Sequence, residues 1–214
     1  MGLSAFTLNS CQNQPEVDST NPFFSEYNTP FNVPPFEKIM AKHYLPAFER
    51  GMEEGREDLK ALLKNREEPN FENTIGAFDK AGELLTKVSS VFFAQASANT
   101  NDSIQNIEME ISPRLAGYYD EITLNPDLFL RVKQVYENQQ NLSLTPEQKF
   151  ILENLYKQFV RNGANLGKED QDTLRKINQR LSVLGVQFSQ NVLEETNNYR
   201  LFVGEEGLAG LPNR

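Results

Sequence analysis

Apolar residues recur along most of the chain at steps of three and four, the spacing that places them on one face of a helix. The first such stripe predicts a helix over about residues 44–64. Its members are Leu45, Phe48, Met52, Gly55, Leu59 and Leu62. Pro46 falls within the first turn of this helix, where a missing backbone N–H costs little.

A second stripe is broader and predicts a central, heavily buried helix. Its members are Ile75, Phe78, Gly82, Leu85, Ser89, Phe92 and Ala96, flanked by Ala77, Ala81, Leu84, Val88 and Val91. Asn70 precedes the stripe and is placed to cap the helix with its side-chain carbonyl. The small residues Gly82, Ser89 and Ala96 would let a neighbouring helix approach closely.

The rest of the chain continues in the same period. Residues 104–122 predict a third helix, with a kink at Pro113. Asn125 and Pro126 predict the start of a short helix, and the capping box at Thr145 starts another that ends near Gly163. A last long helix is expected over about residues 169–198. Its stripe is Leu174, Ile177, Leu181, Leu184, Phe188 and Val192.

Only residues 199–203, Tyr-Arg-Leu-Phe-Val, suggest a strand, and a strand needs a partner. The predicted fold class is therefore all-α: an antiparallel array of about six helices, with a short edge strand near the C-terminus. We expect three segments. Residues 1–35 form a flexible tail and an extended leading segment, residues 36–200 a helical domain, and residues 201–214 a linker.

Composition narrows the functions that this fold could serve. The chain has 214 residues, of which 38% are hydrophobic and 24% charged, values typical of a globular domain. The formal charge of −9 opposes binding to nucleic acid, whose phosphates attract cationic side chains. The Gly-containing runs also lack the glycine, lysine and hydroxyl pattern of a phosphate-binding loop. The single cysteine excludes an intrachain disulfide.

Few residues qualify as catalytic candidates. His43 is the only histidine, and to act as a base it would need Cys11 or a serine within hydrogen-bond reach. Because Cys11 lies in the predicted tail, we interpret His43 as a structural residue at a helix start. Four acidic pairs could suggest a metal site, but the side chains of adjacent residues on a helix point in directions about 100° apart. We therefore interpret these pairs as parts of solvated faces and turns. They are Glu53–Glu54, Glu67–Glu68, Glu194–Glu195 and Glu205–Glu206. We assign no catalytic, cofactor-binding or metal-binding residue.

Cys11 has a different candidate role. Leu8 lies three residues before it and the small Ser10 is adjacent, so residues 6–11 resemble the end of a bacterial lipoprotein leader, whose cysteine becomes acylated. Only ten residues precede Cys11 and none is basic, which is short for a leader. A lipid anchor at Cys11 would favour the bacterial cell envelope, and an unmodified cysteine would leave a cytoplasmic protein as the alternative.

Three longer runs occur in a recognisable order. Residues 21–54 read NPFFSEYNTPFNVPPFEKIMAKHYLPAFERGMEE, residues 71–138 begin FENTIGAFDKAGELLTKVSSVFFAQAS, and a run from residue 156 leads to GLAGLP at residues 207–212. Together they resemble the amino-terminal helical region of the zinc peptidyl-dipeptidases related to thimet oligopeptidase. In that family an HExxH helix supplies two histidines to the metal. With a single histidine, this chain resembles the region without its catalytic part.

The resemblance implies zinc in a longer parent enzyme and none in this chain. It also implies two partners: short peptides, and the missing C-terminal catalytic domain, toward which residues 201–214 would lead. The implied function is the noncatalytic wall of a channel in a peptidase that releases C-terminal dipeptides from short peptides. If the chain is a fragment ending at Arg214, an apolar patch should be exposed where the catalytic half would lie. The alternative is a stand-alone helical module, tethered through lipid or not, that binds a peptide or a partner helix in an apolar groove.

Overall fold

Helix α1, Tyr44–Lys64, has the bounds that the first stripe predicts. In the computed structural model, which describes residues 20–210, it is one of six helices longer than ten residues. The others are α3 (Glu83–Ala98), α4 (Asp102–Thr123), α5 (Pro126–Glu137), α6 (Pro146–Arg161) and α7 (Lys168–Asn198). No strand occurs in this part of the chain, so the all-α prediction is confirmed.

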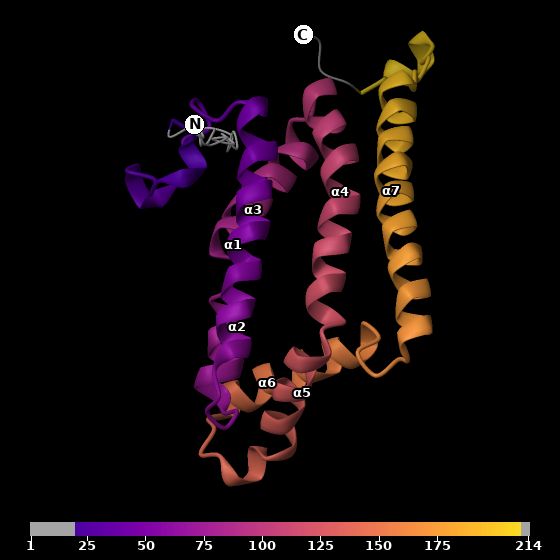
Figure 1. Ribbon diagram of the computed structural model, residues 1–214. Helices are drawn as coiled ribbons and strands as arrows, with labels where there is room; N and C mark the ends of the chain where they lie inside the picture. The colour runs from indigo at the N-terminus through magenta and orange to yellow at the C-terminus, as the bar shows by residue number, and fades with distance from the viewer. Residues whose placement is uncertain (1–19, 211–214) are drawn as a thin grey trace, which may run out of the picture.

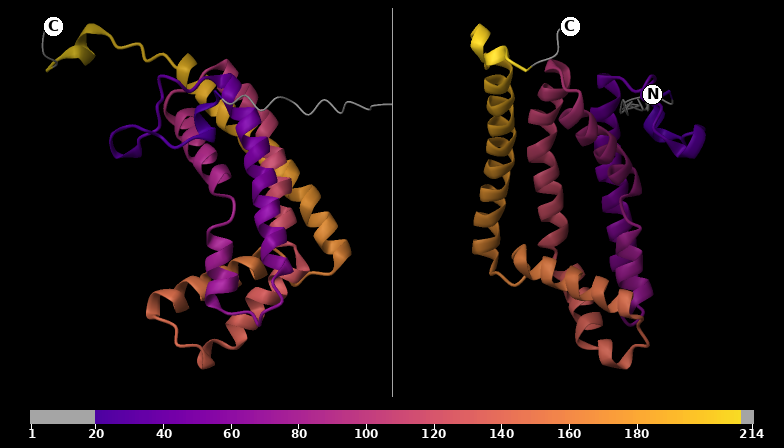
Figure 2. Two further views of the ribbon diagram at one scale, coloured as in Figure 1. Left: turned by 60° about the vertical axis from the view of Figure 1, so that its left-hand side comes forward. Right: turned by 180° about the vertical axis from the view of Figure 1, so that it is seen from behind.

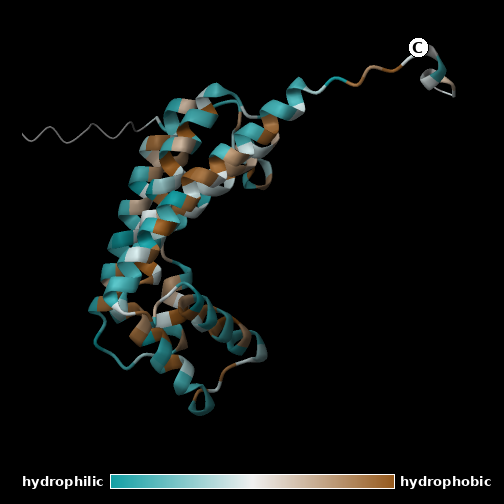
Figure 3. Cartoon of the chain, turned by 90° about the vertical axis from the view of Figure 1, so that its right-hand side faces the viewer, coloured by the Kyte–Doolittle hydropathy of each residue, from teal (hydrophilic) through white to brown (hydrophobic). Residues whose placement is uncertain are grey.

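The helices form one elongated layer closed at one end. Helices α1 and α3 pack against each other, α4 lies beside them, and α7 lies on the outer side of α4 (Figure 1; Figure 2, right). Helices α5 and α6 pair with each other and lie across the end of this layer. In side view the outline is a crescent (Figure 3).

The second predicted helix is not continuous, which corrects the sequence analysis. It begins with a π-helical turn, Phe71–Gly76, passes through the short α2 (Ala77–Asp79), and stops before α3 begins. Gly82 causes the break because its φ is +71°, in the left-handed region that favours glycine. The Gly82 N–H donates to the Asp58 carboxylate of α1 at 3.0 Å, which satisfies the backbone at the break.

The predicted caps are confirmed. The Asn70 side chain accepts the Asn73 N–H, and the Asn125 side chain accepts the N–H groups of Asp127 and Leu128. Thr145 forms the expected capping box at the start of α6. These caps satisfy backbone donors that each helix start would otherwise leave unpaired.

Helix α4 runs through Pro113 as one element.

The predicted edge strand is wrong. Residues 199–203 form no strand, and Leu201 and Phe202 are exposed in the part of the chain described. A strand requires another strand beside it for its backbone hydrogen bonds, and none is present among the described residues.

Two hydrophobic cores hold the layer together. The first joins the leading segment, the first half of α1, α3 and α4, and is centred on Tyr44, Phe48 and Phe92. The second joins the end of α1, the π-helical turn, α5 and α6. Phe23 of the leading segment is buried in the first core, and Lys87 Nζ donates to the carbonyl oxygens of Phe23 and Ser25. Residues 23–25 of the predicted extended segment are therefore packed against α3.

Candidate functional site

The only imidazole of the chain is tied into the start of α1. His43 is 4% exposed, and its Nδ1 accepts the N–H of Met40 at 3.0 Å. Its carbonyl oxygen accepts from Asn21 Nδ2 at 2.9 Å. Cys11 lies outside the described residues, so the structure does not test whether the two come together. These contacts make His43 part of the packing between the leading segment and α1.

Three of the acidic pairs, at residues 53–54, 67–68 and 194–195, lie at the surface in the described part of the chain. Glu54 is paired with Arg50 at 2.7 Å, and Glu53 with Arg56 at 3.7 Å, both along α1. In residues 20–210 no group of three or more His, Cys, Asp or Glu side chains converges in a way that could hold a metal ion. Glu53 and Glu54 each have a basic neighbour within their own helix, as expected of solvated ion pairs.

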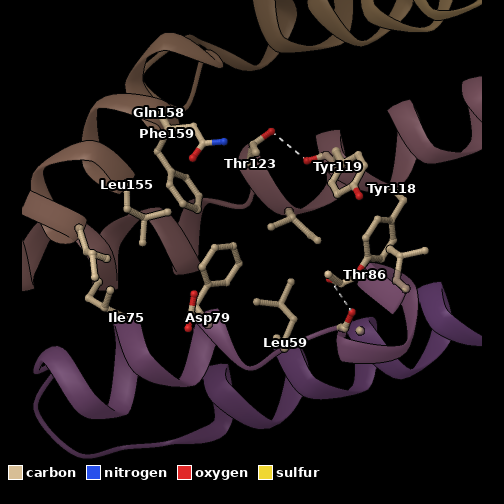
Figure 4. A pocket seen from close by; sticks show the side chains of 17 residues that line it. Leu59, Ile75, Asp79, Thr86, Tyr118, Tyr119, Thr123, Leu155, Gln158 and Phe159 are labelled. Atoms are coloured by element: carbon tan, nitrogen blue, oxygen red, sulfur yellow. Dashed lines mark hydrogen bonds between the residues drawn. The ribbon is translucent and has the colours of Figure 1, made fainter. Parts of the chain in front are cut away.

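A pocket lies where the two cores meet. Its volume is about 380 Å³ (Figure 4). Its walls come from five segments: α1, the π-helical turn with α2, the α2–α3 break with the first turn of α3, α4 and α6. The apolar wall includes Leu59, Ile75, Phe78, Leu85, Ile122, Leu155 and Phe159. Residues of both cores line this pocket, so its shape depends on how the two cores are held relative to each other.

Polar groups line the same pocket at several points. They belong to Asp79, Thr86, Tyr118, Tyr119, Thr123 and Gln158. Burial raises the pKa of the phenol groups of Tyr118 and Tyr119 above 10.0, so both are neutral near pH 7. They can donate and accept hydrogen bonds but do not supply charge. The pocket is thus suited to binding an apolar group through contact and a few hydrogen bonds.

The Tyr118 side chain packs in the pocket wall beside two glycines, Gly55 and Gly82. A Cβ at Gly55 would collide with the Tyr118 hydroxyl, and a Cβ at Gly82 would lie 3.6 Å from it. The first predicted stripe includes Gly55 and the second includes Gly82, but their spacing indicated only helix contact. The sequence analysis missed this pocket because its walls come from five segments spread over about 100 residues, between Gly55 and Phe159.

The outer face of α7 exposes a stripe of apolar residues. These residues face solvent from the third turn onward: Ile177, Leu181, Leu184, Phe188 and Val192. Val186 is the one buried residue of this 31-residue helix. The exposed apolar patch expected for a fragment is therefore present in the described part of the chain.

Two side-chain hydrogen bonds join α7 to α4. Asp120 of α4 is 6% exposed, and its Oδ1 accepts from Asn178 Nδ2 at 2.7 Å. Further along, Gln190 Nε2 donates to the Gln105 carbonyl oxygen at 3.4 Å. Burial raises the pKa of Asp120, against the opposing effects of Asn178 and Arg175. Asp120 is thus a buried carboxyl group at the interface with α4, the one extensive helix contact of α7 within residues 20–210.

Within residues 20–210 no helix is both long and apolar enough to cross a bilayer.

Sequence comparison finds a consistent set of relatives. The chain is 38% identical over 196 residues to a dipeptidyl carboxypeptidase of Escherichia coli, a match that covers 91% of the chain and 29% of that protein. It is 36% identical over 194 residues to a dipeptidyl carboxypeptidase of Salmonella typhimurium, covering 90% of the chain and 28% of that protein. Oligopeptidase A of Escherichia coli is 27% identical over 194 residues, again over 90% of the chain and 28% of the relative. No family model matches the chain. The chain thus spans less than a third of the length of these curated relatives.

Proposed function

Since this chain belongs to the thimet oligopeptidase family, as an amino-terminal helical region of it, we propose that it is the noncatalytic part of a zinc peptidyl-dipeptidase. In this proposal the parent enzyme releases C-terminal dipeptides from short peptides, and these helices form one wall of its substrate channel. The observation that carries the proposal is the 38% identity to a dipeptidyl carboxypeptidase over 91% of the chain.

Zinc, in this proposal, belongs to the remainder of the parent enzyme. The described residues do not fit a zinc site because their single imidazole is buried, with Nδ1 accepting the Met40 N–H, and no set of three ligand side chains converges. The chemistry that zinc would supply, polarising a carbonyl and activating water, therefore has no residue to act through in this part of the chain.

The role proposed for these helices is to shape the channel. Two separate cores meet at the pocket between α4 and α6, so the wall presents an apolar hollow with neutral hydroxyl groups at its edge. Such a surface holds apolar side chains of an extended peptide by contact. It would also keep folded proteins away from the metal by its bulk, since a folded domain cannot enter a channel built for one chain.

A chimeric enzyme tests this proposal. The matched 196 residues of the Escherichia coli dipeptidyl carboxypeptidase would be replaced by the corresponding residues of this chain, and release of C-terminal dipeptides from short peptides would be measured. We expect zinc-dependent activity well above that of the same enzyme with the matched region deleted. The proposal is wrong if the chimera is folded by circular dichroism but no more active than the deletion.

The proposal extends to the membrane through Cys11. We propose acylation of Cys11 and a bacterial envelope location, with a cytoplasmic enzyme as the alternative. The support is Leu8 and Ser10 before Cys11. Fractionation of the native host is the test: the protein should partition with membranes, and Cys11→Ala should release it. An unmodified cysteine in the native protein would leave the cytoplasmic alternative.

A further inference from the structure

The outer face of α7 combines three features that a solvated helix face does not have. Its apolar residues at positions 177, 181, 184, 188 and 192 recur at steps of four, three, four and four, so they lie on one side of the helix. Phe188 is 69% exposed, although phenylalanine is among the residues most often buried. An exposed stripe of this length is larger than the scattered apolar residues usual on a monomer.

The same section of α7 also lacks charge. Residues 181–193, Leu-Ser-Val-Leu-Gly-Val-Gln-Phe-Ser-Gln-Asn-Val-Leu, contain no acidic, basic or histidine residue, in a chain that is 24% charged. The exposed face of a solvated helix is normally charged or polar, because charged side chains remain hydrated at little cost. An uncharged, exposed apolar section is instead typical of a helix that packs on both sides.

Gly185 lies within this stripe, between Leu181 and Phe188. A Cβ added at Gly185 would meet no neighbouring atom within 4 Å in the described part of the chain, so no described contact requires a glycine there. Glycine in the middle of a helix is less favourable than alanine, since it loses more conformational freedom on folding. A glycine on an apolar helix face is useful when another helix must approach the backbone closely.

We infer that the outer face of α7 docks the part of the parent enzyme that lies beyond the region matched here, through an uncharged helix packed over Gly185. This inference rests on the proposed function. The matched region covers only 29% of the dipeptidyl carboxypeptidase relative. In a parent enzyme of similar length, the remaining polypeptide is large enough to cover a helix of 31 residues. The inner face of α7 is already occupied by α4, so the outer face is the one left to bind it.

The test uses two variants of α7 and one matched control, each in the isolated chain and in the chimera with the Escherichia coli enzyme. Phe188→Asp places a charge in the stripe, and Gly185→Ala adds a methyl group where the partner helix would approach. Phe150→Asp is the control, since Phe150 of α6 is 67% exposed and lies outside the stripe. The readouts are the melting temperature, dipeptide release, and hydrogen exchange of the α7 backbone amides.

In the isolated chain we expect Phe188→Asp to leave the melting temperature unchanged and Gly185→Ala to raise it. In the chimera we expect both to lower it, with dipeptide release reduced at least tenfold by Phe188→Asp and unchanged by Phe150→Asp. The α7 amides should exchange more slowly in the chimera than in the isolated chain. The reversed sign of Gly185→Ala separates docking from a purely local effect on helix stability.

Three results would overturn the inference. A chimera that is active but responds to Phe188→Asp no more than to Phe150→Asp would leave the proposed function standing and reject the docking face. An isolated chain that sediments as a dimer, and as a monomer with Phe188→Asp, would make the stripe an interface between two copies. A folded but inactive unsubstituted chimera, with α7 amides exchanging as in the isolated chain, would reject both the proposed function and the docking face.

Discussion

Helices α3 and α7 have apolar stripes of the same period, but only the stripe of α3 is covered. Helix α3 buries Leu85, Val88, Val91 and Phe92 against α1 and α4. Helix α7 is nearly twice as long and buries only Val186, while its stripe faces solvent. Periodicity therefore identifies a helix and its apolar face, but it does not show whether another surface covers that face.

The largest expected effect comes from removing one phenylalanine from each helix. Phe92 is fully buried, with its ring 4.9 Å from that of Tyr44 and 5.3 Å from that of Phe48. We expect Phe92→Ala to lower the free energy of unfolding by about 3–5 kcal/mol, through lost burial and the cavity left behind. Phe188→Ala should change it by less than about 0.5 kcal/mol, as for other exposed sites. Urea unfolding of both variants measures the difference, and equal losses would contradict the comparison.

A methyl group added to a glycine should act in opposite directions in the two regions. A Cβ at Gly51 of α1 would lie 2.8 Å from the Leu85 Cα of α3, so backbone would have to move. Gly51→Ala should therefore destabilise the chain by about 1–3 kcal/mol. Gly185→Ala, with open space around it, should stabilise the chain by about 0.5–1 kcal/mol. Thermal unfolding would measure both, and a loss with Gly185→Ala in the isolated chain would mean that α7 is more crowded than the structure has it.

The break before α3 should also be sensitive to a side chain. Gly82 has a φ of +71°, where an L residue with a Cβ costs about 1–2 kcal/mol. We expect Gly82→Ala to lower the free energy of unfolding by about that amount. Gly167→Ala, at a φ of −66° with no atom near the added methyl group, is the control and should cost less. If the two variants unfold at the same urea concentration, the left-handed break does not form in solution.

The smallest expected effect is the response of the α4–α7 interface to pH. Burial raises the pKa of Asp120 above its ordinary value of 3.8, so the folded chain binds this proton more tightly than the unfolded chain. The contribution of Asp120 to stability is therefore greatest below pH 3.8 and decreases as the pH rises through the raised pKa. In Asp120→Asn this contribution should be absent. The measurement is the difference in unfolding free energy between the two proteins from pH 3 to pH 7. A difference that does not vary with pH would contradict the burial of this carboxyl group.

The helices could be located from sequence because their signals are local. Asn70, Asn125 and Thr145 each cap a helix through contacts within three residues, so their spacing alone was sufficient. Gly82 shows the limit of such reasoning. The position of Gly82 on the stripe was compatible with a continuous helix. The break is stabilised by a hydrogen bond from the Gly82 N–H to the Asp58 carboxylate of α1, a residue 24 positions earlier in the sequence.

The candidate pocket was less accessible to sequence reasoning. The pocket depends on α6 lying across the end of α1 and α4, which no local pattern indicates. The predicted strand at residues 199–203 failed for a related reason, since a strand is defined by its neighbour and none is present in the described residues.

The sequence by itself determined that this chain is helical, where most helices begin and end, and that a single histidine cannot provide an HExxH zinc site. These features depend on residue identity and on spacing within a few turns. Only the tertiary structure decided that the apolar face of α3 is buried and that of α7 is exposed. It also decided that there are two hydrophobic cores and that Asp120 is enclosed between α4 and α7. Those outcomes depend on contacts between residues far apart in the chain, whose free energies arise only when the helices come together.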